Sequence, residues 1–285
     1  MSGVALQKQA PPSWNRSLNA TRAAEQQLLR SVQAYLGGPD VTDAQIAAAI
    51  ESGPDAVATL MAGPEATAEL LAGYKLAATK IFDVAETGAY DSLGIALNFA
   101  LDNPYSAPWI LTHGAQLVVG VGDLTRQAIR QVVSQGFEEH LTVDQMTRQI
   151  RGWIGLLPRQ VDAADRYAAT LGTGPKAERA LARYVSQLRQ ERARNIARTE
   201  TINAHAQGTL SAWRNASDHG LIRPGAQKEW IAATASDRTC PICMKMDGQR
   251  VALTGLFTLP NGTQIEAPTA HPSCRCAMSL TWKKA

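Results

Sequence analysis

Two short stretches near the C-terminal end, Cys240-Pro241-Ile242-Cys243 and His271-Pro272-Ser273-Cys274-Arg275-Cys276, contain all four cysteines of the 285-residue chain. A Cys-x-x-Cys turn directs two sulfurs at one point, and a second pair can complete a tetrahedral zinc site. The sequence between the two stretches is long enough for a loop or hairpin that brings them together. The pattern therefore predicts a small metal-binding module over residues 239–276, which we call the zinc clamp.

The zinc clamp offers five candidate ligands for the four positions of a tetrahedral site. In one arrangement all four ligands are thiolates from the two cysteine pairs. In the other, three thiolates join the imidazole of His271, and either Cys274 or Cys276 stays a buried thiol. Without a metal, the cysteines would be reduced thiols in a small core or would form two disulfides. The candidate ligands are Cys240, Cys243, His271, Cys274 and Cys276.

The same pattern favours a structural zinc over a catalytic one. A catalytic zinc keeps an open coordination position beside an acid or base, whereas either ligand set closes the coordination sphere. Glu200 and His205 are the nearest acid–base candidates, but they lie five residues apart in a predicted helix and do not share a face. We therefore predict no catalytic residue. Arg198, Glu200 and Trp230 are instead expected to support the fold of the module.

The chain before residue 220 is predicted to be almost entirely helical. Aromatic residues make up only 6% of the chain, and alanine is frequent, which favours closely packed helices. Capping-box patterns at residues 42–45 and 142–145 are predicted to open two helices. A Gly-Thr-Gly-Pro break at residues 172–175 precedes the longest helical pattern, which runs from residue 176 to about 217.

Three further boundaries follow from glycine, proline and periodicity. Residues 1–17 contain two prolines and no periodic pattern, so we expect a flexible arm. Gly120 and Gly122 are predicted to end a helix that starts after Pro108. Near the C-terminal end, strands are predicted at residues 229–233, 249–253 and 278–282, the first two forming a hairpin.

Charge is distributed unevenly along the chain. Residues 1–120 hold 6 Lys and Arg against 11 Asp and Glu, whereas residues 121–285 hold 22 against 14, so the net charges are −5 and +8. Residues 176–198 alone carry seven basic and two acidic side chains. Such a helix could contact nucleic acid or an acidic partner, although a solvated basic face explains the same pattern. The contact candidates are Arg179, Arg183, Arg189, Arg192 and Arg194.

The sequence contains no segment that is typical of a membrane helix or of a secretory signal. The most apolar segment, residues 109–121, contains His113, Gly114 and Gln116 and is too short to span a bilayer. The first 19 residues contain no apolar core of the kind that signal peptides have. We therefore expect no membrane association and a reducing compartment for the cysteines.

Several motifs in the C-terminal half resemble the phage Mu protein F-like family, the minor head or head morphogenesis proteins of tailed phages. The His-Pro-x-Cys-Arg-Cys ending is the most specific of them, and their order and spacing also match. The resemblance covers about residues 120–280. The motifs are Ala197-Arg198-Thr199-Glu200-Thr201, Ala206, Gly208, Trp230, residues 237–243, Asp247-Gly248 and residues 271–276.

The resemblance implies a virion component with no enzymatic activity. Proteins of this family are present in few copies per particle, associate with the portal vertex and act in head assembly, DNA packaging or DNA delivery. It implies the portal protein, the major capsid protein or scaffold proteins as partners, with packaged DNA as a further contact. The expected locations are the phage head at the portal vertex and, during assembly, the host cytoplasm. A zinc-stabilised nucleic-acid-binding protein using the basic helix is the alternative.

Taken as a whole, the sequence predicts an α+β protein that is mostly α-helical. A helical N-terminal region and long helices precede a small C-terminal β-hairpin module that binds zinc. The expected divisions are a flexible arm (1–17), a helical region for portal or capsid contact (18–119) and a phage Mu protein F-like domain (120–285).

Overall fold

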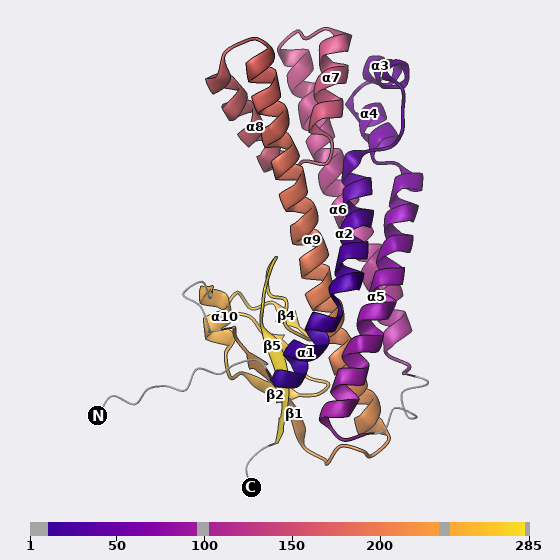
Figure 1. Cartoon of the computed structure of the whole chain (residues 1–285), viewed down its shortest axis with the longest axis vertical. Coiled ribbons are helices and arrows are strands. Elements are labelled where there is room, and N and C mark those ends of the chain that lie inside the picture. The colour runs from indigo at the N-terminus through magenta and orange to yellow at the C-terminus, as the bar shows by residue number, and fades with distance from the viewer. Residues whose placement is uncertain (1–10, 96–102, 234–239, 283–285) are drawn as a thin grey trace, which may run out of the picture. The chain divides into compact units, whose positions relative to one another are not determined.

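The computed structural model describes residues 11–95, 103–233 and 240–282, and it confirms a mostly helical protein with a small antiparallel sheet near the C-terminal end (Figure 1). Its helices are α1 Pro12–Ala20, α2 Arg22–Gly37, α3 Asp43–Glu51, α4 Pro54–Met61, α5 Pro64–Ser92, α6 Ser106–Glu138, α7 Val143–Trp153, α8 Pro158–Leu171, α9 Pro175–Asp218 and α10 Pro241–Met246. Its strands are β1 Ala226–Ile231, β2 Arg250–Ala252, β3 Phe257–Thr258, β4 Gln264–Ile265 and β5 Ala277–Trp282. None of the described helices is both long enough and apolar enough to cross a membrane.

The chain forms two compact units, and each unit combines segments that are far apart in the sequence. Unit 1 consists of Met1–Gln26, Leu76–Leu111 and Ala197–Ala285, and unit 2 consists of Gln27–Lys75 and Thr112–Ile196. Helices α2, α5, α6 and α9 contribute residues to both units. The boundary predicted between residues 119 and 120 lies inside α6, and a separate functional role for residues 120–285 stays a prediction.

Unit 2 is helical, and its core is built from the apolar faces of short, well-capped helices. Both predicted capping boxes form: Thr42 and Thr142 each accept a hydrogen bond from the backbone three residues later, and each Gln side chain accepts one in return. The core that these helices bury includes Ile46, Ile150 and Trp153. Amphipathic helices of this length gain most of their stability from such packing.

Helix α6 differs from the prediction because it continues through both glycines that were expected to end it. Gly120 and Gly122 lie within Ser106–Glu138. Val118, Val121 and Thr125, spaced three or four residues apart on one face, are all buried. Burial of this face offsets the cost of two glycines in a helix, about 1 kcal/mol each.

Unit 1 begins with α1, and here the predicted flexible arm is wrong for residues 12–17. These residues lie in α1, and Trp14 is only 5% exposed in the core of the unit. Residues 1–10 of the predicted arm lie outside the described residues. Pro12 lies at the first position of the helix, where its missing N–H costs nothing. This start signal did not lead to a predicted helix, because the residues around it have no periodic apolar pattern.

A three-stranded antiparallel sheet, with strand order β2-β1-β5, forms the C-terminal part of unit 1. It contains the predicted hairpin strands and the predicted last strand, with Lys228 opposite both Val251 and Leu280. Strands β3 and β4 form a separate two-stranded pair. Lys228 and Trp230 point to the same face of β1, because side chains alternate along a strand, and both are fully buried.

Candidate metal centre

The first cysteine pair lies at the start of α10. Cys240 is the N-cap residue, and its Sγ accepts a hydrogen bond from the backbone N–H of Cys243 at 3.3 Å. Pro241 favours this start because its ring fixes a helical φ angle. The short helix therefore turns both sulfurs toward the same side, with Cys240 half-buried and Cys243 buried.

The second pair follows β4 in a tight loop before β5. The Cys274 N–H donates to the His271 carbonyl oxygen at 3.1 Å, and Ser273 adopts a left-handed backbone conformation with φ of 59°. The Ser273 N–H donates to Thr199 Oγ1 on α9 at 2.9 Å. This bond joins α9 to the loop that carries Cys274, and the supporting roles expected of Arg198 and Glu200 stay predictions.

The structure brings all five candidate ligands together as two overlapping groups. One group is Cys240, Cys243 and His271, and the other is Cys243, Cys274 and Cys276. Within each group the ligand atoms lie within 4.8 Å of one another, and Cys243 belongs to both.

The sulfur–sulfur distance in the cluster suits zinc. The Nε2 atom of His271 lies 3.0 Å from Cys240 Sγ and 3.1 Å from Cys243 Sγ, and the sulfurs of Cys243 and Cys274 lie 3.8 Å apart. Two ligands of one tetrahedral zinc lie about 3.5–3.8 Å apart, because Zn–S bonds are about 2.3 Å and Zn–N bonds about 2.0–2.1 Å. The sulfur–sulfur distance falls in this range, whereas the imidazole lies closer to both sulfurs than two zinc ligands do. The His271 Nδ1 atom lies 2.9 Å from the Pro272 carbonyl, and a proton donated there leaves the Nε2 lone pair facing the sulfurs.

The pKa shifts in the cluster follow from crowding of the thiols. Hydrogen bonds from the Cys243 and Cys276 side chains lower the pKa of Cys274 to about 2, and the bond to Cys274 raises the pKa of Cys243. Burial lowers the pKa of His271, but the Pro272 carbonyl and the Cys274 and Cys240 sulfurs outweigh it and raise the pKa overall. A cluster that already stabilises one thiolate beside an imidazole is suited to a cation.

The three predicted supporting residues lie in different environments. Trp230 is fully buried in β1, beside Cys276, and its ring packs edge-on against Phe257 with 5.3 Å between ring centroids. Glu200 is half-buried on α9, and Arg198 is exposed. Of these residues, Trp230 therefore has the clearest structural role. The sequence analysis did not identify Lys228, whose Nζ donates to the Glu266 carbonyl at 2.7 Å. Its place two residues before Trp230 in a strand puts both side chains on one face and could have revealed its burial.

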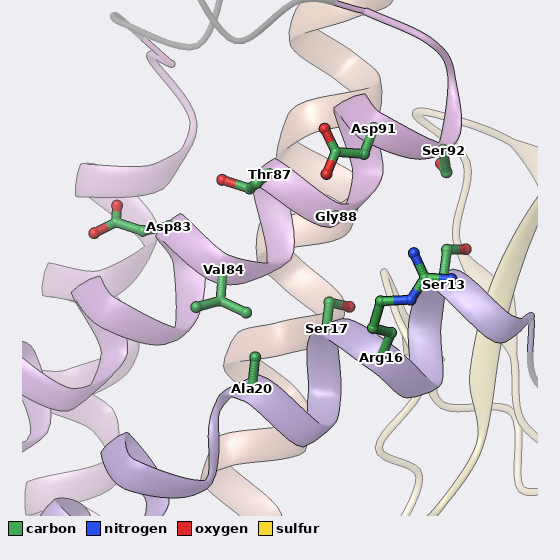
Figure 2. A pocket seen from close by; sticks show the side chains of 10 residues that line it. All are labelled: Ser13, Arg16, Ser17, Ala20, Asp83, Val84, Thr87, Gly88, Asp91 and Ser92. Carbon is green, nitrogen blue, oxygen red and sulfur yellow. The ribbon is translucent and has the colours of Figure 1, made fainter.

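His205 is buried away from the cysteine cluster and pairs with a serine. Its Nε2 lies 2.7 Å from Ser17 Oγ, which donates to the Trp14 carbonyl at 3.1 Å. Because that bond uses the hydroxyl proton, the imidazole Nε2–H donates to Ser17, and the serine is not activated as a nucleophile. Ser17 also lines a cavity of about 460 Å³ between α1 and α5 (Figure 2). Burial lowers the pKa of His205 to about 3, so the imidazole is neutral at physiological pH.

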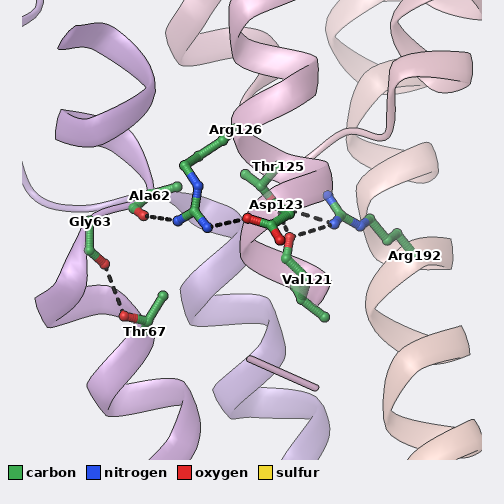
Figure 3. A network of polar contacts seen from close by, with 8 residues as sticks. All are labelled: Ala62, Gly63, Thr67, Val121, Asp123, Thr125, Arg126 and Arg192. Atoms are coloured by element: carbon green, nitrogen blue, oxygen red, sulfur yellow. Dashed lines mark hydrogen bonds and ion pairs between the residues drawn. The ribbon is translucent and has the colours of Figure 1, made fainter. Parts of the chain in front are cut away.

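The structure contradicts one of the predicted arginine contacts. Arg192 is only 4% exposed, and its guanidinium donates to the carbonyls of Gly155 and Leu156 at 3.0 Å. It also donates to Val121 O at 3.2 Å and to Thr125 Oγ1 at 3.1 Å (Figure 3). Contrary to expectation, this side chain is not available to nucleic acid or a partner, because it satisfies carbonyls inside unit 2.

The other four arginines divide into two kinds. Arg189 is half-buried and donates to Ile154 O at 2.8 Å and to Gly152 O at 2.6 Å. The remaining three are exposed on α9; they are Arg179, Arg183 and Arg194. The sequence alone did not separate the half-buried arginine from the exposed ones, because the apolar residues around all of them recur at mixed spacings of three and four.

Comparison with known proteins agrees with the motifs. A family model described as Phage Mu protein F like protein matches residues 127–279, which is more than half of the chain and includes all five clustered ligands. No curated protein and no solved structure matches the chain. On the strength of the family match, this chain belongs to the phage Mu protein F-like family of phage head proteins.

Proposed function

We propose that this protein is a minor capsid protein that acts in head morphogenesis at the portal vertex of a tailed phage. The family match over residues 127–279 carries this proposal. Head proteins of this family are generally structural, and the proposed role is likewise non-enzymatic. The proposed partners are the portal protein and the major capsid or scaffold proteins, and the proposed processes are head assembly, DNA packaging and DNA delivery.

Composition of the particle tests this proposal. Purified virions and proheads are analysed by quantitative mass spectrometry, with the portal protein as an internal standard and a non-structural phage protein as the negative control. We expect this chain in both fractions, in few copies per portal. Cross-linking of proheads should then join it to the portal protein. Its absence from both particles, together with normal expression in infected cells, would refute the proposal.

Within this role, the cysteine cluster is proposed to hold one structural zinc ion. The proposed ligands are Cys240, Cys243, His271 and Cys274, which leaves Cys276 as a buried thiol. Support comes from the 3.8 Å separation of Cys243 and Cys274 and from the place of Cys276 beside Trp230. Zinc bound here would supply folding free energy to a module whose strands are two to six residues long.

Serine substitutions distinguish the proposed ligand set from the alternatives. Cys274→Ser should lose bound zinc, measured by metal analysis of the purified protein, and should lower the melting temperature. Cys276→Ser is the matched control, because it changes the same atom two residues away, and it should keep one zinc per chain. Zinc retained by Cys274→Ser and lost by Cys276→Ser would assign the fourth position to Cys276.

DNA contact through α9 remains a second proposal, with a smaller contact set than the sequence indicated. The exposed Arg179, Arg183 and Arg194 support it. Binding to duplex DNA should weaken as salt is added. The logarithm of the association constant should fall with the logarithm of the salt concentration, with a slope of about −0.9 per phosphate contacted. The triple change of these arginines to Gln should flatten that slope, whereas Arg159→Gln, an exposed arginine on α8, should leave it unchanged.

A further inference from the structure

Unit 2 contains a cavity of about 890 Å³ that no part of the proposed function uses. Four helices, α6 to α9, contribute to its lining. Its polar side chains include Gln135 from α6, Gln149 from α7 and Asp165 from α8. Its apolar wall includes Trp153 and Val185, both buried in the unit 2 core.

Three acceptor oxygens around this cavity have no hydrogen-bond donor among the described residues. They are Gln135 Oε1, Gln149 Oε1 and Asp165 Oδ2, each removed from solvent and without a hydrogen-bond partner. A buried acceptor that has lost water and gained no donor is costly, and most such groups in folded proteins are paired. Amide and carboxyl groups turn easily about their last bond, so these oxygens can face a donor that enters the cavity.

The nearby charges favour a cation as that donor. Glu139 and Glu178 also line the cavity, which gives it three carboxylates with Asp165. Two arginines line it as well, but they donate to backbone carbonyls: Arg148 Nε to Asp144 O at 3.2 Å and Arg189 Nε to Ile154 O at 2.8 Å. Burial, Glu139 and Asp162 raise the pKa of Asp165, and they outweigh a hydrogen bond with the Gln135 side chain that lowers it.

The spread of the acceptors favours an organic cation over a metal ion. Among the described residues, no three carboxylates converge as closely as the cysteine ligands do, so a small ion would lack a complete shell. A guanidinium carries five N–H donors in a planar fork and reaches acceptors that lie on different helices. Its aliphatic stem suits a wall that contains Trp153 and Val185.

We propose that this cavity receives an arginine side chain of a protein partner, held by Gln135, Gln149 and Asp165 with Glu139 and Glu178 at its edge. The inference goes beyond the proposed function and does not depend on the zinc site. It assigns the partner a basic, protruding side chain, and it places the contact in unit 2.

A capped Ala-Arg-Ala peptide tests the proposal by calorimetric titration of the full-length, zinc-loaded protein. The same peptide with citrulline in place of arginine is the ligand control, since citrulline has a similar shape and no charge. We expect the arginine peptide to bind at least about tenfold more tightly, because charge-assisted hydrogen bonds are the stronger kind. Equal binding of the two peptides, or no binding of either at millimolar concentration, overturns the proposal.

Protein variants locate the site. Asp165→Asn should lower the affinity for the arginine peptide by about tenfold or more, and Gln149→Glu should raise it. Glu138→Gln changes an exposed carboxylate that lies beside Glu139 but does not line the cavity, and it should bind as the unchanged protein does. Thermal melting confirms that each variant folds. Unchanged binding in Asp165→Asn, or displacement of the peptide by Ca²⁺ or Mg²⁺ alone, contradicts the assignment to arginine.

Discussion

His205 is a fully buried histidine whose imidazole contacts the Ser17 hydroxyl and packs against the Trp14 ring in a T-shaped arrangement, with 4.5 Å between ring centroids. Its Nδ1 atom has no hydrogen-bond partner among the described residues. No charged group contributes to its pKa shift, which burial alone causes. Protonation would therefore place an uncompensated charge inside the core of unit 1.

Acid should destabilise unit 1 through this histidine. The unfolded chain takes up a proton below a pKa of about 6.5, whereas the folded state does so only near 3. Between these values the unfolded state binds more protons, so the free energy of unfolding should fall by up to about 1.4 kcal/mol per pH unit as pH is lowered. Denaturant melts at several pH values measure this slope.

Two histidine variants make the pH prediction specific. His205→Gln keeps an N–H that can donate to Ser17, and it should flatten the dependence between pH 6 and 4. His219→Gln changes an exposed histidine just after α9 and should leave the slope as it was. An identical slope in all three proteins would show that other groups cause the acid sensitivity.

Gly155 is a residue that cannot be replaced without strain. It has a φ of 79°, and a Cβ atom there would lie 2.1 Å from the Leu36 carbonyl oxygen. Gly155→Ala should therefore lower the free energy of unfolding by about 2 kcal/mol or more, because the backbone is strained and the carbonyl has to move. Gly152→Ala, three residues earlier and with open space around it, should be neutral or slightly stabilising. Equal effects of the two changes would contradict this account.

Among the elements, α9 and the loop at residues 271–276 are joined by a hydrogen bond from the Ser273 N–H to Thr199 Oγ1. Thr199→Val keeps the shape of the side chain and removes the acceptor. We expect it to lower stability by about 1 kcal/mol and to speed the loss of zinc to a chelator, because the loop that carries Cys274 is less constrained.

The same helix supplies a matched control for this change. Thr201 Oγ1 is buried without a hydrogen-bond partner among the described residues, so Thr201→Val should be neutral or stabilising. Chemical denaturation and the rate of zinc release, followed with a coloured chelator, measure both effects. A larger cost for Thr201→Val than for Thr199→Val would contradict the role given to the loop contact.

Local signals in the sequence predicted the elements well where neighbouring residues decide the structure. The capping boxes at Thr42 and Thr142 and the hairpin strands formed as predicted, because a few adjacent side chains determine them. Gly120 and Gly122 misled the prediction because burial of α6 by distant segments outweighs their low helix propensity. The burial of Arg192 depends on carbonyls more than 30 residues away, which no local pattern contains.

For the molecule as a whole, the cysteine cluster lies in unit 1, and its five residues have no counterpart in unit 2 among the described residues. The sequence predicted that the two cysteine pairs meet, since their spacing suits a shared metal. It did not predict that one thiol belongs to both groups or that the chain folds as two units with interleaved segments. Both properties depend on long-range packing.

Removal of zinc should therefore affect the two units unequally. Hydrogen–deuterium exchange with and without a strong chelator should show faster exchange in β1, α10 and β5 after chelation. Exchange in α7 and α8, which lie wholly in unit 2, should stay the same. Cys240→Ser without chelator should reproduce the chelated pattern. Faster exchange throughout the chain would mean that the metal stabilises both units together.

The sharing of Cys243 between the two groups of ligands also has a consequence for mutational tolerance. Every arrangement drawn from either group uses this sulfur, so a scan of all substitutions should find Cys243 the least replaceable position of the cluster. Cys276, packed against Trp230, should accept other small side chains. Metal binding by the cluster should therefore depend most on Cys243, whereas Cys276 should tolerate sequence variation.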